Sequence, residues 1–137
     1  MKIKTSELTK IQLDWAVLKA AGYEPQISFF IKPQVRGSLF AWMRRKNCYY
    51  APMWGLNRFH PSDSWDHAGP IIEREWITLT PTRSGYWGAE IIHAIPGPLD
   101  RYQWLGSGST PLIAAMRCYV TSKLGDEIDV PEELCND

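Results

Sequence analysis

Hydrophobic residues near the start of the chain recur at intervals of three and four positions. A short strand is expected within residues 1–8, and the recurring positions then form one face of a helix, comprising Leu8, Ile11, Trp15 and Leu18. Thr9 and Gln12 match a capping box at the start of this helix, and Gly22 lies where a left-handed glycine would end it. This face is expected to pack in the core.

The middle of the chain alternates between apolar runs and turn residues, which predicts strands. The expected strands are residues 27–31, 38–43, 71–80, 86–95 and 101–105. The third and fourth would form a hairpin around a turn at residues 81–85. Residues 44–70 are rich in Pro, Gly, Asn, Asp and Ser and predict a long, mostly irregular loop, a kind of segment that often carries function.

A second helix is expected from Leu112 to Leu124, with Thr110 as its cap, Pro111 at its first position and Gly125 at its end. Residues 126–137 are acidic and are expected to form a tail on the surface. The pattern predicts a single α+β domain over residues 1–125. Its mainly antiparallel sheet of about 4–6 strands would pack with an N-terminal helix and a C-terminal helix.

Composition limits the classes of partner. The chain has 137 residues, with 15 Lys plus Arg and 15 Asp plus Glu, so it lacks the positive charge expected of a duplex nucleic-acid binder. No apolar run approaches the roughly 20 residues that span a bilayer, and the opening residues lack a signal peptide's apolar stretch. Three widely spaced cysteines form no disulfide framework or metal-binding pair, which suits a reducing cytosol. We expect no membrane contact and no cofactor or metal.

Aromatic residues point to a binding site, because the chain contains seven Trp and flat rings stack on nucleobases. Within the predicted loop, Trp54 and Trp65 could stack on a base, and Asp63 and Asp66 could accept hydrogen bonds from ribose hydroxyls or an amine. The arginines that could neutralise phosphate charge are Arg74, Arg101 and Arg117. The alternative is that both Trp residues pin the loop onto the sheet.

A Gly/Ser-rich segment precedes the second helix and comprises Gly106, Ser107, Gly108, Ser109 and Thr110. Exposed N–H groups and the helix dipole at such a start favour phosphate. The glycines would let the backbone approach a ligand closely. The alternative is a plain loop that ends in an N-cap residue.

Two carboxylates are candidates for acid–base chemistry. Glu73 and Glu75 would share one face of the predicted strand about 7 Å apart, which suits acid–base work or metal binding. No histidine with ligand spacing joins them, and a solvated strand face is the alternative. Cys118, in the second helix, is expected to be a small buried hydrophobe.

Four segments of the chain resemble the NinX-like family of phage proteins. They are residues 1–9 (Met-Lys-Ile-Lys-Thr-Ser-Glu-Leu-Thr), the helix that ends at residues 22–25 (Gly-Tyr-Glu-Pro), residues 61–75 (Pro-Ser-Asp-Ser-Trp-Asp-His-Ala-Gly-Pro-Ile-Ile-Glu-Arg-Glu) and residues 110–134, which begin Thr-Pro-Leu-Ile-Ala-Ala-Met and end Val-Pro-Glu-Glu-Leu. They cover about half the chain, whereas residues 26–60 and 78–108 show little likeness. The resemblance implies a phage origin and expression in the host bacterial cytoplasm. It implies no catalytic residues, because the family is a domain of unknown function.

A more distant similarity is to phage sponge proteins that counter Thoeris-type defence by sequestering a cyclic ADP-ribose signal. Those proteins carry a serine, an alanine six residues on, and then an acidic, Trp-containing strand. Ser62, Ala68 and Glu73–Trp76 are similar to that pattern. The sponges lack the long C-terminal helix expected here.

We therefore predict a phage accessory protein that binds a small nucleotide-like ligand without catalysis. Sequestration of an ADP-ribose-type immune signal, as an anti-defence sponge, is the specific hypothesis. The main alternative is a protein–protein inhibitor or adaptor acting on a host protein, anchored by exposed Trp and Arg. A hydrolase that uses Glu73 and Glu75 is a third hypothesis, and a homo-oligomer is left open.

Overall fold

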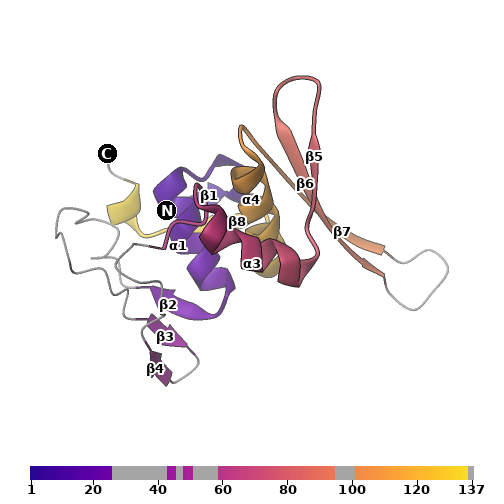
Figure 1. The fold of residues 1–137 in the computed structure, drawn as a ribbon. Helices are drawn as coiled ribbons and strands as arrows, with labels where there is room; N and C mark the ends of the chain where they lie inside the picture. Colours follow the sequence, from indigo (N-terminus) through magenta and orange to yellow (C-terminus); the bar gives the residue numbers. More distant parts are fainter. Residues whose placement is uncertain (26–42, 46–47, 51–58, 95–100, 136–137) are drawn as a thin grey trace.

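A computed structural model describes residues 1–25, 43–45, 48–50, 59–94 and 101–135 (Figure 1). Its helices are α1 (Lys10–Ala20), α3 (Trp65–Glu75) and α4 (Pro111–Leu124), and its short 3-10 turns are η1 (Thr5–Glu7) and η2 (Glu132–Leu134). Its strands are β1 (Lys2–Lys4), β2 (Tyr23–Pro25), β3 (Met43–Arg45), β4 (Cys48–Tyr50), β5 (Thr78–Pro81), β6 (Trp87–Ala94), β7 (Arg101–Gly108) and β8 (Glu127–Asp129).

The described strands pair only in antiparallel fashion. β1 pairs with β8, β3 lies between β2 and β4, and β6 lies between β5 and β7. The prediction of an α+β fold with N-terminal and C-terminal helices is confirmed. The described strands are divided among these three sheets rather than joined in one.

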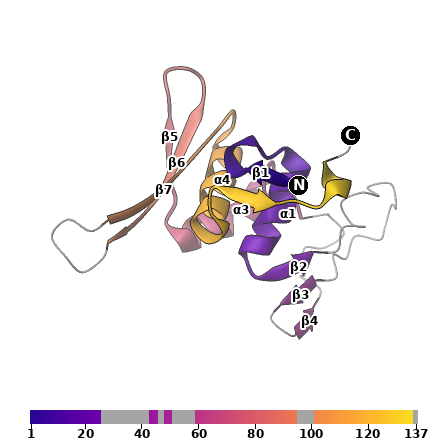
Figure 2. The ribbon, with the colours of Figure 1, turned by 180° about the vertical axis from the view of Figure 1, so that it is seen from behind.

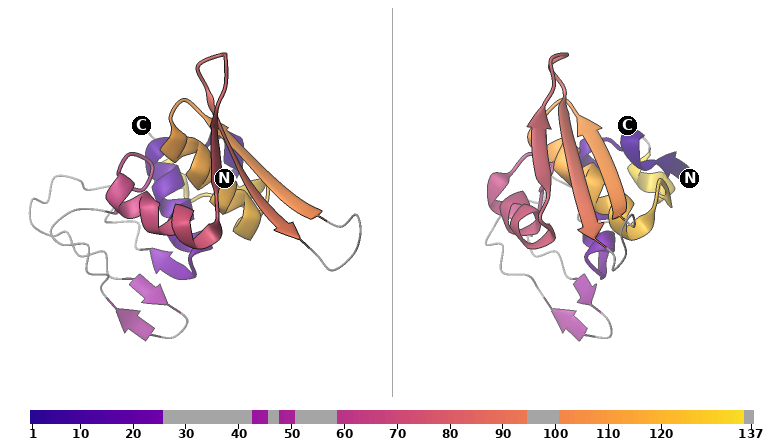
Figure 3. Two further views of the ribbon diagram at one scale, coloured as in Figure 1. Left: turned by 45° about the vertical axis from the view of Figure 1, so that its right-hand side comes forward. Right: turned by 90° about the vertical axis from the view of Figure 1, so that its right-hand side faces the viewer.

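Helix α4 lies at the centre of the core, against one face of the β5–β6–β7 sheet (Figure 3). Thr110 caps it as predicted, since its Oγ1 accepts from the Ile113 N–H at 3.2 Å. The predicted buried face is confirmed, and its buried residues include Leu112, Met116, Tyr119 and Val120. Because α4 is covered on several sides, its position fixes the positions of the elements around it.

Helix α1 also forms as its capping signals predict. Thr9 and Gln12 make the capping box, in which the Thr9 N–H donates to Gln12 Oε1 at 3.0 Å. Gly22 follows the helix with a left-handed φ of 92°, as expected of a glycine at a helix end. The predicted apolar face packs in the core, with Leu8, Trp15 and Leu18 buried and Ile11 partly buried.

The segment from β3 to the hairpin of β5 and β6 differs from the prediction. Residues 71–75, expected in a strand, form the end of α3, and the strand β5 begins only at Thr78. Residues 44–70, expected as irregular loop, contain parts of β3 and α3 and all of β4. The helix is favoured because Ala68 and Ile71, three residues apart, both turn into the core. The strand expected at residues 27–31 and most of that at 38–43 lie outside the described residues.

The hairpin of β5 and β6 around residues 82–86 is confirmed, and β7 is longer than predicted, since it includes Gly106–Gly108. The acidic tail is also more structured than predicted. β8 lies beside β1 (Figure 2), and Ile128, Val130 and Leu134 are buried. The prediction of a surface tail is wrong for these three side chains, because each covers apolar surface of the core. In the described part of the chain, no helix is long and apolar enough to cross a membrane.

Candidate functional site

A pocket of about 210 Å³ forms where the first residues of three helices meet: Lys10 of α1, Trp65 of α3 and Pro111 of α4. The rest of its lining is Ser62, Asp63, Thr110, Leu112 and Ile113. We call it the helix-start pocket. Since each helix N-terminus is equivalent to about half a positive charge, the pocket favours a negatively charged group.

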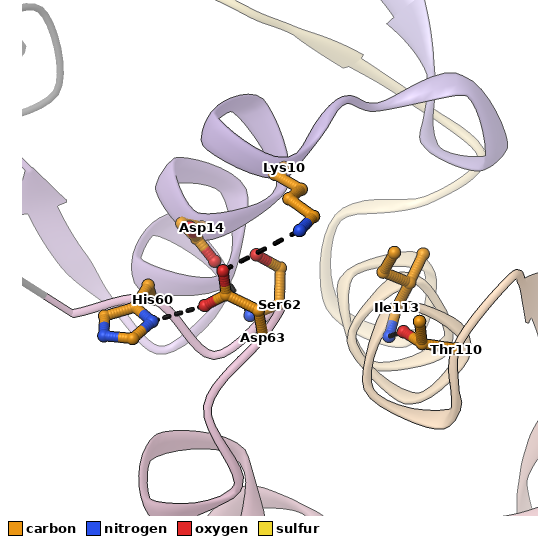
Figure 4. Close-up of polar contacts among 7 residues, drawn as sticks. All are labelled: Lys10, Asp14, His60, Ser62, Asp63, Thr110 and Ile113. Carbon is orange, nitrogen blue, oxygen red and sulfur yellow. Dashed lines mark hydrogen bonds and ion pairs between the residues drawn. The ribbon is translucent and has the colours of Figure 1, made fainter.

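Asp63 supplies the carboxylate of the pocket. Its Oδ2 lies 3.8 Å from Lys10 Nζ, and its Oδ1 contacts Nδ1 of His60 (Figure 4). The Asp63 side chain is about half exposed, at 47%, so a ligand can reach it. Lys10 and Asp63 thus form an exposed ion pair at the rim of the pocket. Each of them can leave the other and bind a ligand instead.

The turn that carries Asp63 is fixed by a buried carboxylate of α1. Asp14 is 1% exposed, and its Oδ1 accepts a hydrogen bond from the Ser62 N–H at 2.9 Å. Ser62 is itself 1% exposed, and its Oγ has no hydrogen-bond partner among the described residues. A buried hydroxyl with unused hydrogen-bonding capacity at a pocket wall is the kind of group that a bound ligand satisfies.

The start of α4 offers fewer donors than its position suggests. Pro111 has no N–H, the Ile113 N–H is taken by Thr110 Oγ1, and the Ala114 N–H donates to the Thr110 carbonyl at 3.1 Å. The remaining donor of this first turn is the Leu112 N–H. The helix therefore contributes chiefly its dipole to the pocket, rather than a cradle of several N–H groups.

Trp65 supplies an accessible ring. It is the first residue of α3 and is 55% exposed, so much of the residue is accessible to solvent while it lines the pocket. The alternative reading, in which Trp65 pins the loop onto the sheet, is not what the structure shows. Asp66, the next residue, is exposed in the first turn of α3 and does not line the pocket.

His67 ties the turn to α3. Its Nδ1 accepts a hydrogen bond from the His60 N–H at 3.0 Å, and the two imidazole rings meet edge to face with centroids 4.7 Å apart. Because Nδ1 must be unprotonated to accept this bond, the neutral form of His67 holds the turn in place. Burial, and then the neighbouring His60, lower the pKa of His67.

Other predicted site residues lie elsewhere. Arg74 is near the far end of α3, roughly 13 Å along the axis from Trp65, and it pairs with Glu75. Arg101 is the first residue of β7, and Ser109 is exposed just before the Thr110 cap. Trp54 lies outside the described residues. The structure thus brings together Asp63, Trp65 and Thr110 of the predicted set.

The Gly/Ser-rich segment is largely strand rather than loop, because Gly106, Ser107 and Gly108 belong to β7. Its glycines are explained by packing. A Cβ at Gly106 would lie 2.4 Å from the Ala114 carbonyl oxygen, and one at Gly108 would lie 2.6 Å from a methyl carbon of Ile113. These glycines therefore let α4 pack closely against β7. The prediction that they let a ligand approach the backbone is not needed to explain them.

The geometry assumed for acid–base chemistry is also wrong. Glu73 and Glu75 lie two positions apart on a helix, where such side chains diverge. Glu73 is exposed, whereas Glu75 Oε2 lies 3.5 Å from Lys123 Nζ. Cys118 is fully buried, as expected, and burial raises the pKa of its thiol to about 12. Within the described ranges, no three His, Cys, Asp or Glu side chains are grouped so that they could hold a metal.

The chain matches a known protein family. A family model described as Bacteriophage P22, NinX matches residues 4–123. The chain belongs to this family. No curated protein matches it. The NinX match includes residues 26–60 and 78–108, where little likeness was expected, so the family relationship extends over most of the chain.

In this NinX-family chain, sequence reasoning missed Lys10, Asp14 and His60 as parts of the site, and it noted Ser62 only in the sponge-like pattern. Asp14 did carry a signal. It lies three residues after Ile11 and four before Leu18, on the predicted apolar face, where a carboxylate needs a buried partner. The other three carry no local signal, because the pocket exists only once three helix starts converge.

Proposed function

We propose that this phage protein binds a small, anionic, nucleotide-derived ligand in the helix-start pocket, without transforming it. The observation that carries the proposal is the convergence of three helix N-termini and Lys10 beside the exposed ring of Trp65. Positive helix ends suit phosphate, and an open indole face suits a nucleobase. A nucleotide-derived ligand carries both groups.

The pocket's size indicates how such a ligand would lie. A volume of about 210 Å³ is below the roughly 300 Å³ at which pockets start to enclose a whole small molecule. We infer that a phosphate and its ribose enter the pocket near Lys10 and Ser62, with Asp63 accepting from a ribose hydroxyl. The base then lies over Trp65, outside the enclosed volume.

Sequestration of an ADP-ribose-type immune signal is the specific role that we propose for this binding. In support, ADP-ribose and its cyclic form offer the phosphate, ribose and flat base that the pocket residues suit. The likeness to Thoeris sponges is not part of this support, since Glu73–Glu75 end a helix here rather than lying in a strand.

The proposal is tested by calorimetric titration of the purified chain with AMP, ADP-ribose and cyclic ADP-ribose. Binding of at least one is expected, and heating the complex should release that ligand unchanged, as analysed by mass spectrometry. Lys10→Gln should weaken binding at least 10-fold, a loss of about 1.4 kcal/mol. Lys19→Gln, which removes a cation at the other end of α1, should leave it unchanged. No heat with any of the three ligands, or equal effects of the two substitutions, would refute the proposal.

A second candidate function is binding of a host protein through Trp76. This side chain is 86% exposed and follows α3 in a left-handed conformation, with φ 56° and ψ 47°. A bulky residue is rarely found in that conformation, and an exposed Trp is a common interface anchor. This candidate predicts that the chain captures a stoichiometric partner from host lysate. Trp65→Ala should still retain that partner, and Trp76→Ala should not.

A further inference from the structure

A second and larger concave surface lies beside β7, away from the helix-start pocket. Its volume is about 680 Å³. Leu105 and Ser107 of β7 line one side, and Lys4 and Glu127, which are paired in the β1–β8 ribbon, line the other. Arg117 and Thr121 of α4 also line it. We call it the β7 groove.

The edge of β7 that faces this groove has unused main-chain groups. At the hairpin end the Thr82 N–H donates to the Tyr86 carbonyl at 2.8 Å, and bonded pairs alternate along an antiparallel ladder. Gly88 therefore pairs toward β5, and Ala89 pairs toward β7 with Gly106. It follows that Leu105 and Ser107, which alternate with Gly106, direct their N–H and C=O groups away from β6.

The contact of Arg117 agrees with this assignment. Its Nη1 donates to the Ser107 carbonyl at 2.9 Å, which requires that carbonyl to point away from β6. Among the described residues, no hydrogen bond to the main chain of Leu105 occurs on this side. The Leu105 side chain is 63% exposed, and an unprotected apolar edge of this kind accepts added strands.

Arg117 also lacks a negative partner. Its Nη2 donates to the Leu8 carbonyl at 3.0 Å, so both of these guanidinium hydrogen bonds are to neutral oxygens. Its Nε is buried without a hydrogen-bond partner, and no described carboxylate forms an ion pair with it. Burial lowers the pKa of Arg117. A partly buried cation held only by carbonyls is stabilised by an incoming carboxylate.

We propose that the β7 groove binds an extended peptide segment, which adds to the sheet beside β7 and brings a carboxylate to Arg117. The main chain of Leu105 would pair with the added strand, as in other cases of strand addition. By bridging Ser107 to Leu8, Arg117 closes the groove at that end, so the carboxylate belongs at or near the end of the bound segment.

The shape of the groove favours a lone peptide over a second copy of this chain. Lys4–Ser6 and Asp126–Glu127 bound the side opposite β7. A strand that enters the groove can therefore pair with β7 on one side but has no room for a further strand on its other side. The β7 strand of another copy would bring its own β6, which is already paired to it. The charges also suit a peptide that carries both signs, since Glu90, Asp126 and Glu127 line the groove together with Lys4 and Arg117.

The test uses the full chain and a synthetic library of random octapeptides, made with free and with amidated C-termini. Bound peptides are identified by mass spectrometry, and their affinities are measured by calorimetry. We expect the enriched peptides to share a carboxylate. If only peptides with free C-termini are enriched, the carboxylate that meets Arg117 is that of the chain end. If amidated peptides that contain Asp or Glu are enriched equally, it is a side-chain carboxylate.

Leu105→Pro is the discriminating variant, because the N–H that it removes faces the groove and is not a donor in the β6–β7 ladder. It should weaken binding of the selected peptides at least 10-fold, whereas Leu105→Val, which keeps the N–H and an apolar side chain, should not. Arg117→Gln should weaken binding as well, with circular dichroism to verify its fold. The proposal is overturned if no peptide is enriched, if Leu105→Pro binds as well as Leu105→Val, or if the edge instead forms a dimer that Leu105→Pro abolishes.

Discussion

The buried carboxylate of Asp14 accepts a hydrogen bond from the main-chain N–H of Ser62, 48 positions away along the chain. This contact joins α1 to the turn that carries Asp63 and leads into Trp65. It therefore sets the relative positions of Lys10, on the same helix as Asp14, and of the carboxylate and ring on the other side of the pocket. The site depends on this long-range contact more than on any local motif.

Removal of the Asp14 carboxylate should destabilise the fold. Asp14→Ala leaves the buried Ser62 N–H without its acceptor, and an unsatisfied buried group costs about 1–3 kcal/mol. Asp14→Asn keeps an acceptor oxygen and should lose less. Urea denaturation measures both, and an Asp14→Ala variant within about 0.5 kcal/mol of the wild type would show that the contact is unimportant.

Gly106→Ala should be strongly destabilising, because its Cβ would meet α4 backbone at 2.4 Å. We expect a loss of about 3 kcal/mol, since neither the strand nor the helix can give way without disturbing the core. Gly88 lies on the neighbouring strand, where a Cβ would meet only the Thr80 carbonyl oxygen at 3.7 Å. Gly88→Ala should therefore melt at or slightly above the wild-type temperature. Similar melting temperatures for the two variants would contradict this account of the packing.

The left-handed conformation of Trp76 should cost stability. Its φ of 56° is unfavourable for a residue with a Cβ by roughly 1–2 kcal/mol, and its 86% exposure means that little burial is lost on substitution. Trp76→Gly should raise the free energy of unfolding by about 1 kcal/mol, whereas Trp76→Ala keeps the strain. Thermal melts check both variants. A clear loss of stability in Trp76→Gly would mean that the ring makes stabilising contacts.

Stability should fall as the pH drops below the ordinary His67 value of 6.5. Because the pKa of His67 is lowered in the fold, the unfolded chain takes up the proton first, and stability declines until the folded chain is protonated too. Well above pH 6.5 both states hold His67 neutral, and this contribution is constant. Urea midpoints between pH 8 and 5 should show a steeper decline for the wild type than for His67→Gln. Parallel curves would show that His67 does not titrate differently on folding.

Sequence signals predicted those elements whose ends are marked by local chemistry. The Thr9–Gln12 capping box and the Thr110–Pro111 start placed α1 and α4 correctly, and the turn before Tyr86 placed the hairpin. Helix α3 was missed because its end is not marked by glycine. Trp76 occupies the left-handed position instead, and the run from Ile71 to Thr80 alternates like a strand.

The candidate site was only partly predictable for a related reason. Asp63, Trp65 and Thr110 are chemically suited residues next to one another or at a helix start, so composition and capping rules could identify them. Lys10 and Ser62 are ordinary in sequence and become part of a site only through tertiary contacts. Gly106 and Gly108 suggested a phosphate loop, but packing against α4 accounts for them.

The central claim is that an anionic, flat ligand lies over Trp65 at the start of three helices. Its most direct test is the dissociation constant of ADP-ribose, measured by calorimetry for Trp65→Ala and Trp76→Ala, two exposed Trp at opposite ends of α3. Loss of the Trp65 ring should weaken binding at least 10-fold, as removal of one stacking ring typically costs about 1–3 kcal/mol, and Trp76→Ala should match the wild type. Equal affinities of all three proteins, or no binding by the wild type, would contradict the account.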